Sequence, residues 1–198
     1  MRYQQSLVDD DFIRLHDLFS AEMTQRLTRE AETQRLSASP WSTRDYMLSG
    51  GGQLSSPRTH QTAGPGPVLR GLHEGKHVVG LLRQMTGQYF FPTRVSYLFY
   101  GPNDFIGLHT DIDPCQVTLL TSVLGSPDPL MVHPELAGIP GAQLLELSQR
   151  TTGRPPGGVA VPVPRGGLLV LRGSRIPHHR PAVRHACGIA TLCYAALA

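Results

Sequence analysis

Short β-prone runs separated by turn signals fill the second half of this chain, and they constrain its fold more than any other feature. From residue 93 onward, segments rich in Val, Ile, Leu, Thr and Tyr alternate with turn sequences such as GPND and GRPPGG. The expected strands are 93–100, 105–109, 116–124, 143–147, 159–163, 167–173 and 188–197. Several short strands at even spacing are typical of a barrel or a sandwich. We therefore expect a mainly β fold.

The first half of the chain predicts helices that flank this β region. Apolar residues recur every three or four positions in 9–36, which predicts an amphipathic helix. The segment 49–67 has many Gly, Ser and Pro residues and is expected to be a loop. A second helix is expected over 68–86, although two glycines weaken it. His73 and His77 lie one turn apart there, and we interpret them as surface or packing residues.

Composition and charge narrow the class of protein. The 198 residues suffice for one domain with its own core, and the hydrophobic share of 40% argues against disorder. The formal charge of +3 comes mostly from scattered arginines, so no nucleic-acid partner is expected, whereas a mildly positive pocket for anionic small molecules fits. No segment resembles a signal peptide or approaches the roughly 20 apolar residues that span a bilayer. We expect a cytoplasmic protein without a membrane partner.

Three cysteines, Cys115, Cys187 and Cys193, stand apart from any CxxC pair. An odd number with this spacing predicts neither a disulfide framework nor a zinc knuckle.

The segment that points to chemistry is YGPNDFIGLHTDID, residues 100–113. His109 and Asp111 end a β-prone run there, and residues i and i+2 of a strand point to the same side. An imidazole and a carboxylate can then converge on one ion, a donor pair suited to Fe(II). A third ligand is expected from His178 or His179, which follow the apolar run 167–173. Two histidines and one carboxylate leave coordination positions open for O₂ and a bidentate cosubstrate.

With these motifs in place, residues 90–197 resemble the iron(II)/2-oxoglutarate-dependent oxygenases, particularly the prolyl-hydroxylase-like branch. The resemblance rests on SYLFYGPNDFIGLHTD and on GGLLVLRGSRIPHHRPAVRHACGIATLCYAAL. It implies a double-stranded β-helix, or jelly-roll, barrel over residues 91–198, buttressed by residues 1–90 within a single domain of 1–198. His178, directly after Pro177, fits the family register best as the third ligand, with His179 as the alternative. Tyr100 resembles a family tyrosine near the cosubstrate.

The sequence departs from this family at the residue that anchors 2-oxoglutarate. Members carry Arg or Lys on the last strand, nine or ten residues after the second histidine, where this chain has Cys187 and Gly188. We expect Arg184 to take over this role. Arg172 and Arg94 are the other candidates, and Arg180 is interpreted as a surface or substrate-facing charge.

The resemblance implies an Fe(II)- and 2-oxoglutarate-dependent oxygenase that uses O₂ to hydroxylate an unactivated C–H bond. The expected substrate is a small molecule such as an amino acid or a biosynthetic intermediate. Two alternatives stay open: an Fe(II) oxygenase with a different cosubstrate, and a non-catalytic β-barrel binding module in which the His-x-Asp pattern is accidental.

Overall fold

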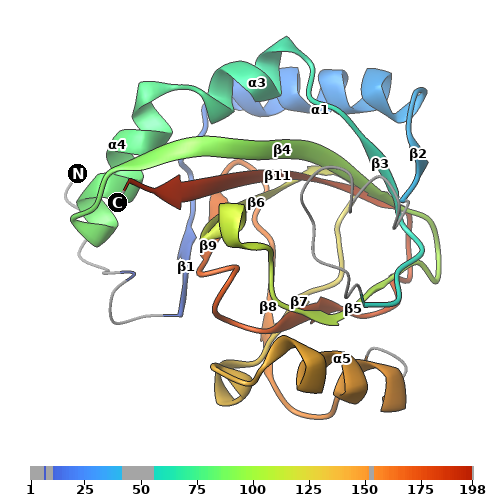
Figure 1. Ribbon diagram of the computed structural model, residues 1–198. Coiled ribbons are helices and arrows are strands. Elements are labelled where there is room, and N and C mark those ends of the chain that lie inside the picture. Colours follow the sequence, from blue (N-terminus) through green and yellow to red (C-terminus); the bar gives the residue numbers. More distant parts are fainter. Residues whose placement is uncertain (1–6, 8–10, 42–55, 152–153, 198) are drawn as a thin grey trace.

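Two antiparallel sheets face each other in the computed structural model of the chain, which describes residues 7, 11–41, 56–151 and 154–197 (Figure 1). The larger sheet has seven strands in the order β1-β9-β6-β11-β4-β3-β2, and the smaller sheet has four in the order β5-β10-β7-β8. The strands of the larger sheet are β1 (Phe12–Leu15), β2 (Ser39–Pro40), β3 (Gln61–Ala63), β4 (Phe90–Tyr100), β6 (Val117–Leu124), β9 (Leu168–Leu171) and β11 (Cys187–Ala196). Those of the smaller sheet are β5 (Ile106–His109), β7 (Leu130–Val132), β8 (Val159–Val161) and β10 (His178–Arg180).

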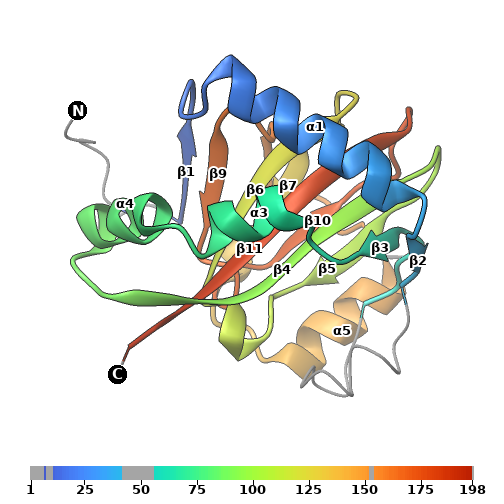
Figure 2. The same cartoon turned by 90° about the horizontal axis from the view of Figure 1, so that it is seen from above.

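Helices lie on the outer faces of both sheets. Figures 1 and 2 show α1, α3 and α4 over the larger sheet, whereas α5 lies below the smaller one. The helices are α1 (Ala21–Arg35), α3 (Pro67–His73), α4 (Lys76–Thr86) and α5 (Gly141–Arg150), and two short 3₁₀ turns are η1 (Asp113–Cys115) and η2 (Pro134–Leu136). None of the helices described is long and apolar enough to cross a membrane.

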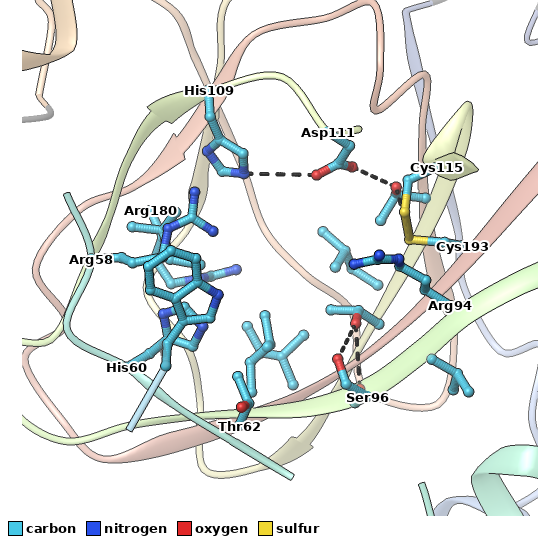
Figure 3. A pocket seen from close by; sticks show the side chains of 18 of the residues that line it. Arg58, His60, Thr62, Arg94, Ser96, His109, Asp111, Cys115, Arg180 and Cys193 are labelled. Atoms are coloured by element: carbon cyan, nitrogen blue, oxygen red, sulfur yellow. Dashed lines mark hydrogen bonds and ion pairs between the residues drawn. A yellow bond between two sulfur atoms is a disulfide. The ribbon is translucent and has the colours of Figure 1, made fainter. Parts of the chain in front are cut away.

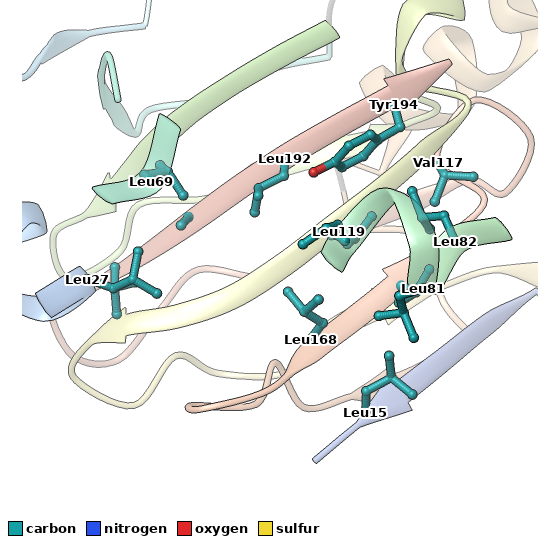
Figure 4. Close-up of a cluster of buried hydrophobic side chains, with 14 of the residues drawn as sticks. Leu15, Leu27, Leu69, Leu81, Leu82, Val117, Leu119, Leu168, Leu192 and Tyr194 are labelled. Atoms are coloured by element: carbon teal, nitrogen blue, oxygen red, sulfur yellow. The ribbon is translucent and has the colours of Figure 1, made fainter. Parts of the chain in front are cut away.

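The larger sheet has two differently packed faces because successive side chains of a strand point to opposite sides. On β4, Tyr97 and Phe99 point toward the helices and join the main core, shown around Leu119 and Leu192 in Figure 4. The alternate residues of β4, β6 and β11 face the smaller sheet and line a cavity between the two sheets. The candidate site lies in this cavity, between the inner faces of the two sheets.

A buried carboxylate ties the helical layer to the sheet. Glu30 of α1 accepts hydrogen bonds from the backbone N–H groups of Val68 and Leu69, at 2.6 and 2.9 Å, and from the hydroxyl of Tyr97, at 2.7 Å. A carboxylate at a helix N-terminus satisfies N–H groups that lack an intrahelical partner. Glu30 therefore fixes α1, α3 and β4 relative to one another.

The single helix expected over 9–36 was wrong in its first part. Phe12–Leu15 form β1, paired with β9 from Phe12↔Leu171 to Leu15↔Leu168, and the helix begins only after the N-cap Ser20. The apolar stripe fits a helix, but pairing with the buried strand β9 buries Ile13 and Leu15 on the sheet instead. Tertiary pairing overrides local periodicity here. Asp9 and Asp10 lie outside the described residues.

Four further expectations need correction. The segment expected as strand 143–147 lies inside α5, where Leu144 and Ser148 are buried one turn apart and most residues are good helix formers. The helix expected over 68–86 is divided into α3 and α4 at Gly75, whose backbone is extended. The expected barrel is, over the described residues, a pair of facing sheets without closure, which is consistent with a jelly-roll arrangement. Of the expected loop 49–67, residues 61–63 form β3, and 49–55 lie outside the described part.

Candidate metal centre

Two strands of the smaller sheet bring the candidate ligands together. His109 ends β5 and His178 begins β10, and the two residues are direct partners in this antiparallel pair. Their ring centroids are 4.5 Å apart. Asp111 follows in the turn after β5, held by its backbone N–H, which donates to the carbonyl of Gly173 at 2.8 Å. Residues almost seventy positions apart in the sequence thus meet at one edge of the cavity.

The geometry of these three side chains suits a metal ion. Asp111 Oδ1 lies 3.7 Å from the Nε2 atoms of both His109 and His178, and the three potential ligand atoms are all within 4.8 Å of one another. The two Nδ1 atoms lie 2.8 and 2.9 Å from the carbonyls of Gly107 and Ile176. A carbonyl can only accept, so Nδ1 carries the hydrogen and Nε2 presents its lone pair. Both rings are therefore oriented as ligands.

The carboxylate of Asp111 is held from its other side. Oδ2 accepts a hydrogen bond from the hydroxyl of Thr118 on β6, at 2.5 Å, which leaves Oδ1 directed at the two imidazoles. Burial, with His178 and Arg58 nearby, holds the pKa of His109 well below its usual range. A neutral imidazole is the form that binds a metal.

His179, the alternative third ligand, lies on the opposite face of β10. Its Nδ1 forms a 3.0 Å hydrogen bond with Nε2 of the fully buried His133, whose Nδ1 donates to Glu135 at 2.8 Å. The rings of His133 and His179 are stacked at 5.1 Å. Burial, reinforced by His133, lowers the pKa of His179 to about 4. The structure therefore brings His178, and not His179, to His109 and Asp111.

The three side chains open into a cavity of about 680 Å³ between the sheets, seen in Figure 3. This volume is in the range of small-molecule sites. Tyr100 lines it and is buried, which raises the pKa of its hydroxyl to about 12. Arg94 also lines it, while Arg172 does not.

Arg184, the expected cosubstrate anchor, lies outside this cavity. Its side chain is 80% exposed and pairs with Asp128, with an Nη2–Oδ1 distance of 2.8 Å. The expectation for Arg184 therefore has no support in the geometry. Cys187 stands at the position where the family pattern has the anchor, and its thiol is free and buried. Its backbone lies opposite Tyr100 in the β11–β4 pair.

Arg180 is instead the buried guanidinium of the cavity. Its side chain lines the same space as His178, because the two residues are separated by one position on β10. It is 2% exposed, its Nη1 donates to the carbonyl of Asp128 at 2.6 Å, and its Cζ lies 5.3 Å from the ring of Tyr100. Residues i and i+2 of a strand point to the same side, and this rule predicted that Asp111 lies beside His109. It would also have predicted Arg180 beside His178 if a strand had been expected at 178–180.

Two further cavity residues come from the segment expected to be a loop. Arg58 forms an isolated β-bridge with Ile106, and its guanidinium lies 4.4 Å from the ring of Trp41. His60 is buried and stacks on Tyr100 at 5.4 Å. Neither residue carries a periodic signal in the sequence, since long-range pairing places both.

A disulfide joins Cys115 and Cys193 in the cavity wall. The number and spacing of the cysteines did not indicate a disulfide framework, and they gave no signal for this single bond. The pair is separated by 78 residues, and only the approach of η1 to β11 brings the two thiols together.

Comparisons with known proteins identify the fold. No family model and no curated protein matches the sequence. Solved structures do match, at low identity. A prolyl hydroxylase from Trichoplax adhaerens, in complex with a hypoxia inducible factor peptide fragment, is 14% identical with a TM-score of 0.68, over 95% of this chain and 84% of that one.

Two other structures agree with this match. A prolyl-4-hydroxylase from Pseudomonas putida is 14% identical with a TM-score of 0.62, over 97% of this chain and 96% of that one. The epimerase SnoN, in complex with Fe³⁺, alpha ketoglutarate (2-oxoglutarate) and nogalamycin RO, is 14% identical with a TM-score of 0.68, over 98% of this chain and 80% of that one. The chain therefore has the fold of the iron(II)/2-oxoglutarate-dependent oxygenases.

Proposed function

We propose that this chain is a non-haem Fe(II)- and 2-oxoglutarate-dependent oxygenase that hydroxylates a C–H bond of a small molecule. The observation that carries the proposal is the convergence of two Nε2 atoms and one carboxylate oxygen at the edge of a cavity, on a fold used by such oxygenases. His109, Asp111 and His178 would hold the ion. With 2-oxoglutarate bound to it, iron(II) supplies the oxidising chemistry.

The reaction proposed is balanced by the cosubstrate. One atom of O₂ enters the C–H bond of the substrate as a hydroxyl group, and the other enters succinate as 2-oxoglutarate loses CO₂. The protein contributes binding, orientation and exclusion of water. The buried His178 and the apolar cavity residues Leu120, Leu130 and Ile189 provide such surroundings.

Arg180 supports 2-oxoglutarate as the cosubstrate. Among the described residues no carboxylate pairs with its buried guanidinium, and a buried charge without a counter-ion is unfavourable. Guanidinium groups bind carboxylates through paired N–H donors. The Cα atoms of His178 and Arg180 are about 6.6 Å apart along an extended strand. A short diacid that chelates the metal with one end can therefore meet Arg180 with the other.

Arg180 would thus replace the missing arginine of the last strand. Its Cζ lies 5.3 Å from the ring of Tyr100, which is the partner of Cys187 in the β4–β11 pair, so the guanidinium lies near the position where the family pattern has its basic residue. The small side chain of Cys187 leaves room for an arginine that reaches in from β10.

The test is anaerobic titration of the Fe(II)-loaded protein with 2-oxoglutarate, followed through the weak visible charge-transfer band of the chelate. We expect the band in the wild-type protein, at least tenfold weaker affinity in Arg180→Gln, and less than a twofold change in Arg184→Gln. The double variant Arg180→Val/Cys187→Arg moves the charge to the last strand and should recover binding. Unfolding curves of each variant separate lost binding from lost structure.

Each failure has its own meaning. Bound iron without a 2-oxoglutarate band would favour an oxygenase with another cosubstrate. Unchanged metal content in His109→Ala would contradict the metal site itself and favour a non-catalytic binding module. With iron and 2-oxoglutarate bound, a panel of amino acids and small biosynthetic intermediates should include one that increases succinate release.

A further inference from the structure

The disulfide between Cys115 and Cys193 lies close to the carboxylate of the candidate metal centre. Both cysteines are buried and both line the cavity, on the side of Asp111 (Figure 3). Cys115 ends η1, which begins two residues after Asp111, and Cys193 belongs to β11. The bond therefore joins the segment that carries a metal ligand to a central strand of the larger sheet.

One hydroxyl group connects the disulfide with the carboxylate. Thr118 of β6 lies opposite Cys193 in the β6–β11 pair. Its Oγ1 is 3.7 Å from Sγ of Cys193 and donates a hydrogen bond to Oδ2 of Asp111 at 2.5 Å. A disulfide sulfur carries no hydrogen, so in this state the sulfur does not donate to the hydroxyl. Because Oδ1 of the same carboxylate faces His109 and His178, the position of Thr118 affects how that oxygen is presented to an ion.

Reduction of the disulfide changes this contact from the side of the sulfur. Two thiols are no longer bonded, so they separate to van der Waals contact, and each gains a hydrogen that it can donate. Sγ of Cys193 then moves within a buried wall, and its S–H group can donate to Oγ1 of Thr118. Both effects disturb the hydroxyl that holds Asp111.

The turn around η1 has other attachments that reduction leaves intact. The hydroxyl of Thr93 on β4 donates to the carbonyl of Pro114 at 2.6 Å. The side chain of Gln116 accepts the backbone N–H of Ala196 at 2.8 Å. We therefore expect η1 to stay in place without the disulfide, so that the effect of reduction on the carboxylate passes through Thr118.

The cavity gives a small reductant access to the bond. Both cysteines are buried, but a cavity of about 680 Å³ admits a small dithiol. A thiolate of the dithiol attacks one sulfur, the S–S bond breaks and a mixed disulfide forms, which the second thiol of the reagent resolves. The protein gains two electrons and two protons, and the dithiol becomes a disulfide.

We propose that the disulfide between Cys115 and Cys193 is a redox switch of the metal site, which binds its ion more tightly in the oxidised form because Thr118 then holds Asp111 in place. The inference rests on the metal site of the proposed function and adds its regulation. Metal binding and reduction are then linked in both directions. The factor by which reduction weakens metal binding is also the factor by which bound metal opposes reduction.

The test measures Mn(II) binding by the full chain in both redox states. The protein is reduced with dithiothreitol, the reagent is removed under argon, and free Mn(II) is measured from its electron paramagnetic resonance signal during a titration. Loss of a contact that supports a ligand typically costs 10- to 100-fold in metal affinity, so we expect the reduced protein to bind Mn(II) about tenfold more weakly.

Two single variants separate the thiol beside Thr118 from the loss of the disulfide itself. Both Cys115→Ala and Cys193→Ala lack the bond and therefore its contribution to stability. Cys115→Ala keeps the thiol of Cys193 and should bind Mn(II) as weakly as the reduced wild type. Cys193→Ala has no thiol there and should bind as tightly as the oxidised wild type. Cys187→Ala, which removes the free buried thiol, is the control and should respond to reduction as the wild type does.

A second measurement tests the reverse direction of the linkage. The protein is equilibrated with mixtures of reduced and oxidised dithiothreitol, with and without saturating Mn(II), and its thiols are alkylated and counted by mass spectrometry. The ratio of reduced to oxidised reagent that opens half of the disulfide should rise with Mn(II) by the factor found for the affinities.

Equal Mn(II) affinities of the oxidised and reduced wild type would overturn the proposal, and so would equally weak binding by the two single variants. In either case the oxidised protein still binds Mn(II), and the proposed function is unaffected. If the oxidised wild type binds no Mn(II), the metal site fails, and the proposed function and the switch fail with it.

Discussion

The carboxylate of Asp111 lies in the space that a side chain at Gly173 would occupy. A Cβ built on Gly173 overlaps Oδ2 of Asp111 and stands 2.6 Å from Oγ1 of Thr118. The backbone carbonyl of the same glycine accepts the N–H of Asp111. Gly173, which follows β9, therefore shapes the turn that presents the carboxylate.

Gly173→Ala should weaken metal binding without unfolding the protein. The methyl group would displace the carboxylate from Thr118 and from the two imidazoles, and loss of such supporting contacts typically costs 10- to 100-fold in metal affinity. Competition with a chelator measures the affinity. Gly71→Ala, in α3, is the control, because a Cβ there has no neighbour within 4 Å. Equal affinities of the two variants would contradict the role assigned to Gly173.

Substitutions of His178 and His179 should affect different properties, metal binding for His178 and folding stability for His179. His178→Ala removes a ligand and should abolish stoichiometric Fe(II) binding. His179→Ala should keep the metal but destabilise the fold by about 1–3 kcal/mol, because it leaves Nε2 of the buried His133 without its partner. Metal analysis and urea unfolding measure the two properties. Metal loss in His179→Ala, with His178→Ala still loaded, would reverse the assignment.

The metal-free protein should become less stable as the pH is lowered, because the buried His60 resists protonation in the folded state. The pKa of this buried histidine is lowered to about 3, whereas the unfolded chain binds the proton near its ordinary value of 6.5. Stability is thus complete above pH 6.5 and is lost progressively as the pH falls toward 3, by roughly 2 kcal/mol at pH 5. His60→Phe keeps a ring against Tyr100 and should lose less stability between pH 7 and pH 5. Parallel pH profiles of variant and wild type would contradict this origin.

The disulfide between Cys115 and Cys193 should contribute stability that a reductant removes. It closes a loop of 78 residues, and bonds of this kind typically stabilise by about 2–4 kcal/mol. Calorimetric melting with and without dithiothreitol checks this. The double variant Cys115→Ala/Cys193→Ala should melt near the reduced wild type and be insensitive to reductant. A shift by dithiothreitol that persists in the double variant would point to the buried Cys187 instead.

The residues that sequence patterns locate well are those governed by local geometry. The spacing of His109 and Asp111 at the end of a β-prone run predicts that their side chains converge, and the structure places Nε2 of His109 3.7 Å from Oδ1 of Asp111. Most strands of the second half lie within a few residues of their expected bounds because β-branched and apolar residues fill them. The sequence predicts β6 as a strand, but it does not show which residues this strand faces. The hydrogen bond from Thr118 to Asp111 could therefore not be predicted.

The residues that sequence patterns miss depend on long-range pairing. β10 has three residues between turns, too short for a periodic signal, so its alternation and with it the inward direction of Arg180 could not be predicted. Arg184, by contrast, was expected inside from spacing alone, and Asp128 holds it at the surface. The contacts of Arg58 and His60 likewise arise from a chain crossing that no local pattern encodes.

The shortness of β10 has a further consequence. His178 and Arg180 occupy alternate positions of one strand, with His179 between them facing His133. If this strand slipped by a single residue against β5, every side chain would change sides. The imidazole of His178 and the guanidinium of Arg180 would then both point away from the cavity. Binding of the metal ion and binding of its diacid partner therefore depend on the same few backbone hydrogen bonds.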